Sequence, residues 1–126
     1  MRAGKRCSEV GEKGKNRAKT GGKNVIILTA SGDRDHAIMN ICASAFGNAG
    51  QKCSACSLLL VERSVYNDPE FRHKLIDCAT SMKVGSVWNA GNIVGPMITN
   101  KNEKLLKALE TLEEGEEWPH RADTLH

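Results

Sequence analysis

The sequence lacks any long hydrophobic run, and this absence narrows the classes of protein to which it can belong. No apolar segment approaches the ~20 residues that cross a bilayer as a helix. The first residues, MRAGKRCSEVGEKGKN, also lack the apolar middle of a secretory signal. We therefore expect neither a membrane span nor a secretory leader.

The chain contains five cysteines, so they cannot all pair in disulfides within the chain. Small secreted domains that are held by disulfides carry even numbers of cysteine at regular spacings. An odd number without a secretory leader favours a reducing compartment. We therefore expect a cytoplasmic protein.

Charge is unevenly distributed along the chain, although its formal net charge at pH 7 is only +3. Residues 1–24 carry a net charge of +6, and the remaining residues carry a net charge of −3. A basic segment of this kind can contact nucleic acid or an anionic membrane surface. The same segment is rich in glycine and nearly free of bulky apolar side chains, which is more typical of a solvated tail. We predict a disordered tail over residues 1–18 and no specific nucleic-acid site.

Hydrophobic periodicity in the first half predicts a strand, a helix and a second strand. The β-branched run NVIILTA (24–30) and the run SLLLVE (57–62) each predict a buried strand. The intervening helix begins at Ser31 or Asp33 as its N-cap and ends at Gly47. Its predicted buried stripe has a period of 3.6 residues and comprises Ala37, Ile38, Ile41, Cys42, Ala45 and Phe46.

The second half predicts two further helices around an irregular segment over residues 86–98. Asp68 caps one helix and Pro69 is its first residue; its predicted buried face comprises Phe71, Leu75, Ala79 and Met82. The other spans 100–114, where Asn100 and Glu103 have capping-box spacing and the predicted inward residues are Leu105, Leu109 and Leu112. With 40% hydrophobic residues the chain can form a core. The element order predicts an α/β layer architecture with a partly parallel sheet.

Cys53 and Cys56 form a C-x-x-C pair between a glycine-containing loop and an apolar strand. Such a pair is half of a structural zinc site, which needs four ligands. The remaining cysteines and the helical histidines lack ligand spacing: Cys7, Cys42, Cys78, His36 and His73. We expect no metal site.

Other roles for the pair stay open on spacing alone. A dithiol redox motif usually stands where a helix begins, whereas here a strand follows. Alternatively, Cys53 is a single nucleophile, exposed on a rigid turn where backbone N–H groups can stabilise an oxyanion, and Cys56 only packs. Redox exchange, covalent catalysis and simple core packing are all compatible with the pattern.

Several segments resemble the aldehyde dehydrogenase superfamily. GQKCSACSLLLVE is similar to the segment around its nucleophilic cysteine, and TGGKNVIILTA is similar to the strand that opens its catalytic domain. DRDHAIMNICASAFGNAGQKCSA, MKVGSVWNAGNIVGPMI and LETLEEGEEW resemble one branch, the L-glutamate γ-semialdehyde (1-pyrroline-5-carboxylate) dehydrogenases, often fused to proline dehydrogenase in bacteria. The resemblance implies a catalytic-domain fragment over residues 19–118, followed by a tail over 119–126.

This resemblance implies NAD-dependent oxidation of an aldehyde, L-glutamate γ-semialdehyde in proline catabolism, through a cysteine thioester. It makes Cys53 the nucleophile, with its own N–H as one oxyanion donor. It also implies that Ser54 holds the substrate carboxylate and that Thr20 and Gly21 pass near the nicotinamide. The alternative for Ser54 and for the two glycines at 21 and 22 is an ordinary turn.

The sequence departs from the family pattern at one catalytic position. Lys19 stands where the family has the glutamate that acts as general base for thioester hydrolysis. A lysine is cationic at neutral pH and cannot accept a proton from water. Residues 1–18 do not resemble the family's preceding segment, and its dinucleotide-binding domain has no counterpart in the sequence.

These departures lead us to expect a fragment that is inactive alone and that associates with complementary pieces or with itself. Two alternatives to the fragment of an enzyme remain. One is a non-catalytic interaction protein on the same scaffold, and the other is a C-x-x-C redox protein.

Overall fold

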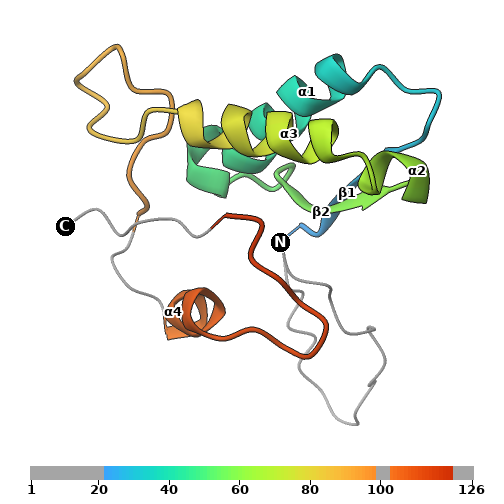
Figure 1. Cartoon of the computed structure of the whole chain (residues 1–126). Helices are drawn as coiled ribbons and strands as arrows, with labels where there is room; N and C mark the ends of the chain where they lie inside the picture. The colour runs from blue at the N-terminus through green and yellow to red at the C-terminus, as the bar shows by residue number, and fades with distance from the viewer. Residues whose placement is uncertain (1–21, 99–102, 121–126) are drawn as a thin grey trace, which may run out of the picture.

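The computed structural model describes residues 22–98 and 103–120. Lys19, Thr20 and Gly21 therefore lie outside the described residues, as do the tail predicted over 1–18 and residues 121–126 of the second tail. The element order is strand, helix, short 3₁₀ turn, strand and three helices (Figure 1). The elements are β1 (Asn24–Leu28), α1 (Arg34–Phe46), η1 (Gly47–Gly50), β2 (Cys56–Val61), α2 (Arg63–Tyr66), α3 (Pro69–Ser81) and α4 (Glu103–Glu110).

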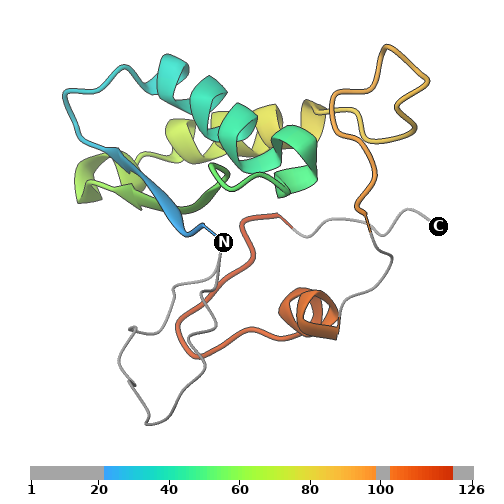
Figure 2. The same cartoon turned by 180° about the vertical axis from the view of Figure 1, so that it is seen from behind.

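The two strands form a parallel pair connected through α1, as the alternation of strands and helices predicts. Val25 pairs with Leu58 and Leu28 pairs with Val61. The register shifts at the start of the ladder, where Asn24 pairs with Cys56. Helices α1 and α3 lie side by side over the sheet (Figures 1 and 2). The predicted α/β class is confirmed.

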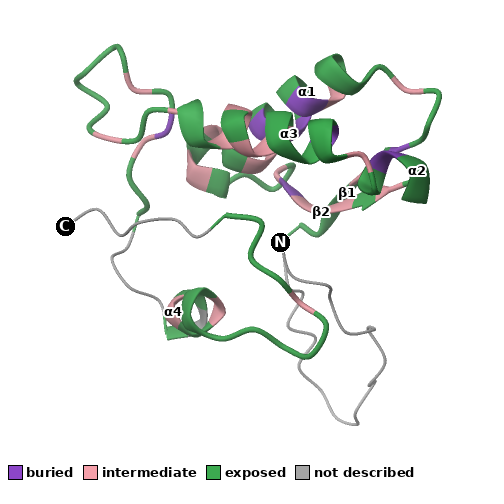
Figure 3. Ribbon diagram, in the orientation of Figure 1, coloured by how far each residue is buried: buried purple, intermediate pink, exposed green. Residues whose placement is uncertain are grey.

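The core lies between the sheet and these helices (Figure 3). Four elements each contribute one buried side chain to it: Leu28 from β1, Ile38 from α1, Val65 from α2 and Phe71 from α3. The remaining predicted positions of the α1 stripe differ in burial. Ile41 and Cys42 are buried and the two alanines are half-buried, but Phe46 is 41% exposed because it is the last residue of α1.

The caps of α1 and α3 follow the sequence closely. Of the two candidate caps for α1, Asp33 is the one used, since its Oδ1 accepts from the N–H of His36 at 2.9 Å. Asp68 accepts from the N–H of Glu70 at 3.0 Å, and Pro69 is the first residue of α3. The single-turn helix α2 was not predicted, although it carries Val65, which is fully buried.

Helix α4 is shorter and more exposed than its pattern predicts. It spans Glu103–Glu110 within the predicted range of 100–114, and Asn100 of the predicted capping box lies outside the described residues. The prediction that its leucines point inward is wrong, because α4 lies apart from the sheet and its covering helices (Figures 1 and 2). The exposed fractions are 37% for Leu105, 41% for Leu109 and 43% for Leu112.

Residues 86–98 are irregular, as predicted, and Val94 makes an isolated parallel bridge with Val84. An ion pair between Arg72 of α3 and Glu117, at 2.6 Å, connects the C-terminal segment to the helical layer. Among the residues that the structure describes, no helix is long and apolar enough to cross a membrane.

Candidate active site

The loop that precedes Cys53 has an unusual backbone. Three consecutive residues adopt positive φ angles: Asn48 at 53°, Ala49 at 55° and Gly50 at 70°. Such angles favour glycine and are tolerated by asparagine, but they are costly for alanine. Gln51 stabilises the loop by donating to the carbonyl of Asn48 from its backbone N–H, at 3.1 Å, and from Nε2, at 3.2 Å. The loop therefore reverses the chain between α1 and Cys53.

Cys53 and Ser54 are the central residues of a tight turn. The N–H of Ala55 donates to the carbonyl of Lys52 at 3.1 Å, which closes the turn. Cys53 is a free thiol on an exposed residue, and Ser54 beside it is exposed as well. Among the described residues, neither the Cys53 nor the Ser54 N–H meets an acceptor. The turn thus presents a thiol, a hydroxyl and two backbone donors together.

Cys56 has a different environment from Cys53, although only two residues separate them. It is buried at the start of β2, where its N–H donates to Ser44 Oγ at 3.2 Å and its Sγ lies 3.3 Å from the carbonyl of Leu58. The buried Cys56 sulfur contacts the Leu58 carbonyl, and a strand follows the pair in place of the helix N-terminus that lowers a thiol pKa in a dithiol motif. The burial of Cys56 therefore counts against redox exchange by this pair and favours a packing role.

The turn is held against β1 by Asn24, a residue that the sequence analysis did not single out. Its Nδ2 lies 2.6 Å from the carbonyl oxygen of Cys53 and 3.3 Å from that of Ala55. Gly22 lies so close that a Cβ atom there would overlap the Cys53 carbonyl oxygen. The signal that could have found Asn24 is a polar residue at the start of an otherwise apolar strand.

The helical cysteines are poor candidates for a reactive thiol. Cys42 is only 2% exposed, and its pKa is raised from 9.0 to about 12, first by burial and then by a hydrogen bond with Cys78. A thiol with this pKa is almost entirely protonated at neutral pH, and the thiolate is the nucleophilic form. Cys78 is half-buried, and both Cys42 and Cys56 are buried. Among the described cysteines, Cys53 is thus the exposed one.

A cavity of about 480 Å³ lies beside the loop that precedes Cys53. The side-chain oxygen of Gln51 accepts from the N–H of Ile98 at 3.0 Å, so the loop is connected to the irregular segment that forms the other wall. The lining combines amide and apolar groups from Asn48, Gln51, Gly85, Val87, Asn92, Ile93, Gly95, Pro96 and Ile98.

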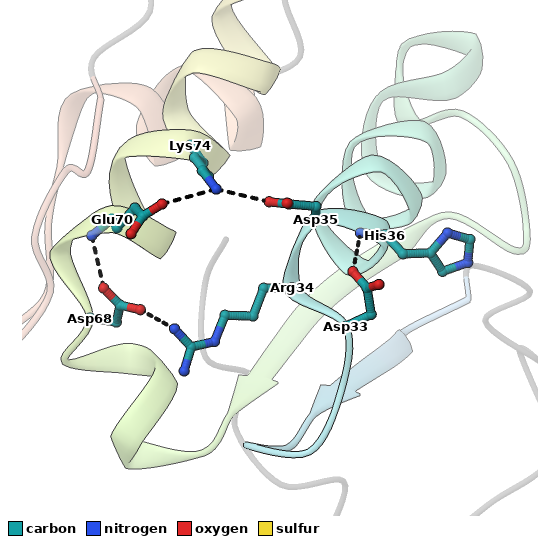
Figure 4. Close-up of polar contacts among 7 residues, drawn as sticks. All are labelled: Asp33, Arg34, Asp35, His36, Asp68, Glu70 and Lys74. Carbon is teal, nitrogen blue, oxygen red and sulfur yellow. Dashed lines mark hydrogen bonds and ion pairs between the residues drawn. The ribbon is translucent and has the colours of Figure 1, made fainter.

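A second cluster of polar residues connects the N-terminal ends of α1 and α3 (Figure 4). Arg34 pairs with Asp68, and Lys74 contacts Glu70 at 3.0 Å and Asp35 at 3.1 Å. Hydrogen bonds to Glu70 and then to Asp35 raise the pKa of Lys74. This cluster stands at the opposite end of α1 from the Cys53 loop, roughly 20 Å away for a helix of this length.

The acidic and basic side chains of that cluster partner one another, which indicates a structural role for them. Over residues 22–98 and 103–120, no group of three histidine, cysteine or acidic side chains is placed to hold a metal ion. The turn around Cys53 is therefore the best candidate for a chemical site in the described residues.

Comparison with known proteins gives consistent results. The sequence profile described as "Aldehyde dehydrogenase family" matches residues 2–120. Malonate-semialdehyde dehydrogenase of Listeria monocytogenes serotype 4a is 34% identical over 87 residues, which are 69% of this chain and 17% of that protein. The chain thus spans about a sixth of the length of the curated relatives it matches.

Two solved structures extend this comparison. Proline Utilization A from Corynebacterium freiburgense is 41% identical with a TM-score of 0.67, over 75% of this chain and 10% of that one. The 1-pyrroline-5-carboxylate dehydrogenase from Thermus, whose structure holds NAD, is 31% identical with a TM-score of 0.58, over 71% of this chain and 16% of that one. The similarity therefore includes both the sequence and the fold.

Proposed function

Because the chain belongs to the aldehyde dehydrogenase family, an oxidoreductase family, we propose that Cys53 is the nucleophile of an NAD-dependent aldehyde oxidation. The observation that carries the proposal is the environment of this thiol. It is exposed, and it stands on a turn whose backbone is fixed by Asn24 and Gly22. A nucleophile needs this combination of access and rigid support.

The proposed chemistry begins at Sγ of Cys53. The thiolate adds to the aldehyde carbon, a C–S bond forms, and the carbonyl π electrons move to oxygen. The Cys53 N–H donates to this oxyanion. Loss of hydride from the same carbon converts the hemithioacetal into a thioester. Water then attacks the thioester, which releases the carboxylate and returns the thiol.

NAD, when bound, supplies the acceptor for that hydride. The described residues fit the group at one point. Gly22 has no side chain, so the backbone that follows Thr20 and Gly21 in sequence runs directly against the Cys53 turn. Thr20 and Gly21 are the residues we propose for the nicotinamide end. The family relatives supply the supporting observation, since the Thermus structure holds NAD.

Thioester hydrolysis is the step for which this chain lacks the family's general base. The position that resembles the family's general base is Lys19, and an ammonium group has no lone pair with which to accept a proton from water. We therefore propose that the chain forms the covalent adduct but does not itself activate the hydrolytic water.

We propose a semialdehyde substrate, namely L-glutamate γ-semialdehyde, with the hydroxyl of Ser54 donating to its carboxylate. The support is the position of Ser54 beside the thiol and the 41% identity to Proline Utilization A. The alternative is malonate semialdehyde, which the name of the Listeria relative favours. Both compounds carry a carboxylate, and they differ in the length of the chain that connects it to the aldehyde.

Alkylation with limiting iodoacetamide tests this proposal, with mass-spectrometric mapping of each cysteine. We expect Cys53 to be alkylated before Cys42 and Cys78, since it is the exposed thiol among the described cysteines and the Cys42 thiolate is scarce. Glutamate γ-semialdehyde should slow the alkylation of Cys53, because a hemithioacetal masks the sulfur. A parallel arm with malonate semialdehyde ranks the two substrates.

Two variants serve as controls for this experiment. In Cys53→Ala the aldehyde should change the alkylation of no remaining cysteine. In Ser54→Ala protection by glutamate γ-semialdehyde should weaken, whereas protection by propanal, which has no carboxylate, should persist. Alkylation of Cys42 or Cys78 ahead of Cys53 would contradict the assignment of the nucleophile.

A further inference from the structure

We infer that Asn24 is a positioning residue for the Cys53 turn, and this inference rests on the proposed role of Cys53 as nucleophile. The carboxamide of Asn24 reaches from the start of β1 to two carbonyls of the turn. Its Nδ2 lies 2.6 Å from the oxygen of Cys53 and 3.3 Å from the oxygen of Ala55. One side chain therefore contacts both the Cys53–Ser54 peptide and the Ala55–Cys56 peptide.

The strand ladder explains why a side chain is needed there. Asn24 pairs with Cys56, whereas Val25 pairs with Leu58, so the register shifts by one residue at the start of the sheet. Ser57 lies at this irregularity, and its hydroxyl donates to the carbonyl of Asn24 at 3.4 Å. The ladder of backbone hydrogen bonds begins at Cys56, and the Asn24 carboxamide extends the connection beyond it to the turn.

The two hydrogen bonds from the Asn24 carboxamide fix the orientation of two planar peptide groups. The peptide between Ala55 and Cys56 is held at its oxygen by Asn24 and at its nitrogen by the hydroxyl of Ser44, at 3.2 Å. The peptide between Cys53 and Ser54 is held at its oxygen by Asn24, and Gly22 packs against the same oxygen. Fixing this second plane fixes the backbone that carries the Cys53 thiol and its neighbouring N–H groups.

Two roles are possible for Asn24: it supports the sheet as a whole, or it positions the Cys53 thiol. The two roles predict different cysteine reactivities when Asn24 is replaced. Loss of a sheet support would loosen the whole layer and make Cys42 and Cys78 accessible. Loss of hydrogen bonds that only position the turn would leave those thiols protected, but it would weaken the addition of an aldehyde to Cys53. Aldehyde protection of Cys53 against alkylation therefore separates the two roles.

The test compares Asn24→Asp, which keeps the shape but replaces the donor with a charged acceptor, and Asn24→Ala, which removes the donor without adding a charge. Thr111→Ala is the control, since Oγ1 of Thr111 donates to the carbonyl of Lys107 at 2.7 Å and Thr111 does not line the cavity beside the Cys53 loop. The readout is the ratio of Cys53 alkylation rates without and with glutamate γ-semialdehyde, measured from pH 7 to pH 9.

We expect the protection ratio to fall about tenfold in both Asn24 variants, in line with the loss of a short hydrogen bond, and to stay unchanged in Thr111→Ala. Cys42 and Cys78 should remain slow to react in all variants. Equal protection in wild type and both Asn24 variants would overturn the inference, as would general exposure of the helical cysteines. Absence of protection in the wild-type chain would instead refute the proposed role of Cys53.

Discussion

Residues 24–81 form a buried core, whereas the described residues between 84 and 118 leave most of their large apolar side chains exposed. In the first region, Leu28, Ile38, Val65 and Phe71 are each at most 5% exposed. In the second region, Trp88 is 94% exposed. Val87 at 70%, Ile93 at 64% and Ile98 at 87% are also exposed, and Val94 at 9% is the exception.

The difference between the regions lies in long-range partners. The first region contains two strands that pair and two helices that cover them, so the face of the sheet that carries Leu28 is buried, whereas Val25 and Ile27 stay exposed. Helix α4 has an apolar stripe of its own, but no other described element lies against most of it. Periodicity therefore produces a helix locally, whereas burial requires a second surface.

The largest expected effect is the loss of a core side chain in the first region. Phe71→Ala removes an aromatic ring that is 4% exposed and should lower the free energy of unfolding by about 3–5 kcal/mol. Thermal unfolding followed by circular dichroism measures this change. The matched variant in the second region is Trp88→Ala, which should change stability by less than about 0.5 kcal/mol. Similar losses in both variants would contradict the contrast between the regions.

A smaller effect is expected where the two helices of the first region begin. Asp68→Ala removes the N-cap of α3 and the partner of Arg34. Caps of this kind contribute about 0.5–2 kcal/mol, and the half-exposed ion pair adds less than about 1 kcal/mol.

Asp77→Ala is the matched control for Asp68→Ala in the same thermal unfolding assay. Its side chain is exposed and pairs with His73 on the helix surface, at 3.2 Å. The control should be nearly neutral. An equal loss in the two aspartate variants would show that the Asp68 contacts add nothing specific to the junction of α1 and α3.

The smallest expected effect is a change in the pH dependence of stability that arises from Cys42. It concerns the first region alone, because residues 84–120 contain no cysteine. The pKa of Cys42 is about 12 in the folded chain and 9.0 in the reference state, so the folded state keeps its proton longer. Stability from this group is complete below pH 9 and is lost as pH rises from 9 toward 12.

The unfolding temperature should therefore fall less steeply over this pH range in Cys42→Ala than in wild type. The comparison uses slopes, because the substitution also removes packing at every pH. Identical slopes in the two proteins would show that Cys42 titrates alike in the folded and unfolded states.

The sequence predicts those features that depend on neighbouring residues. Asp33, Asp68 and Pro69 specify helix ends through contacts within one turn, and the structure contains those contacts. The two apolar runs likewise predict both strands, which end within two residues of the predicted limits, but the prediction that both are buried is wrong for most of β1. Local chemistry is sufficient in these cases.

Features that depend on distant residues were harder to predict. The inward placement of Leu105 and Leu109 failed because periodicity does not show which surface will cover a helix. Asn24 escaped notice because its contact with Cys53 joins residues 29 positions apart. The exposure of Cys53 beside a buried Cys56 agrees with the nucleophile interpretation, which the resemblance to the aldehyde dehydrogenases suggests and the spacing alone leaves open.

The three left-handed residues before Cys53 have a consequence for the evolution and engineering of this chain. Ala49 occupies a conformation that costs an L-residue roughly 1–2 kcal/mol, whereas glycine adopts it freely. Substitution by glycine would relieve the strain but would also enlarge the set of conformations open to the loop. Selection for stability and selection for a fixed thiol therefore act in opposite directions at this position, and a β-branched residue there would satisfy neither.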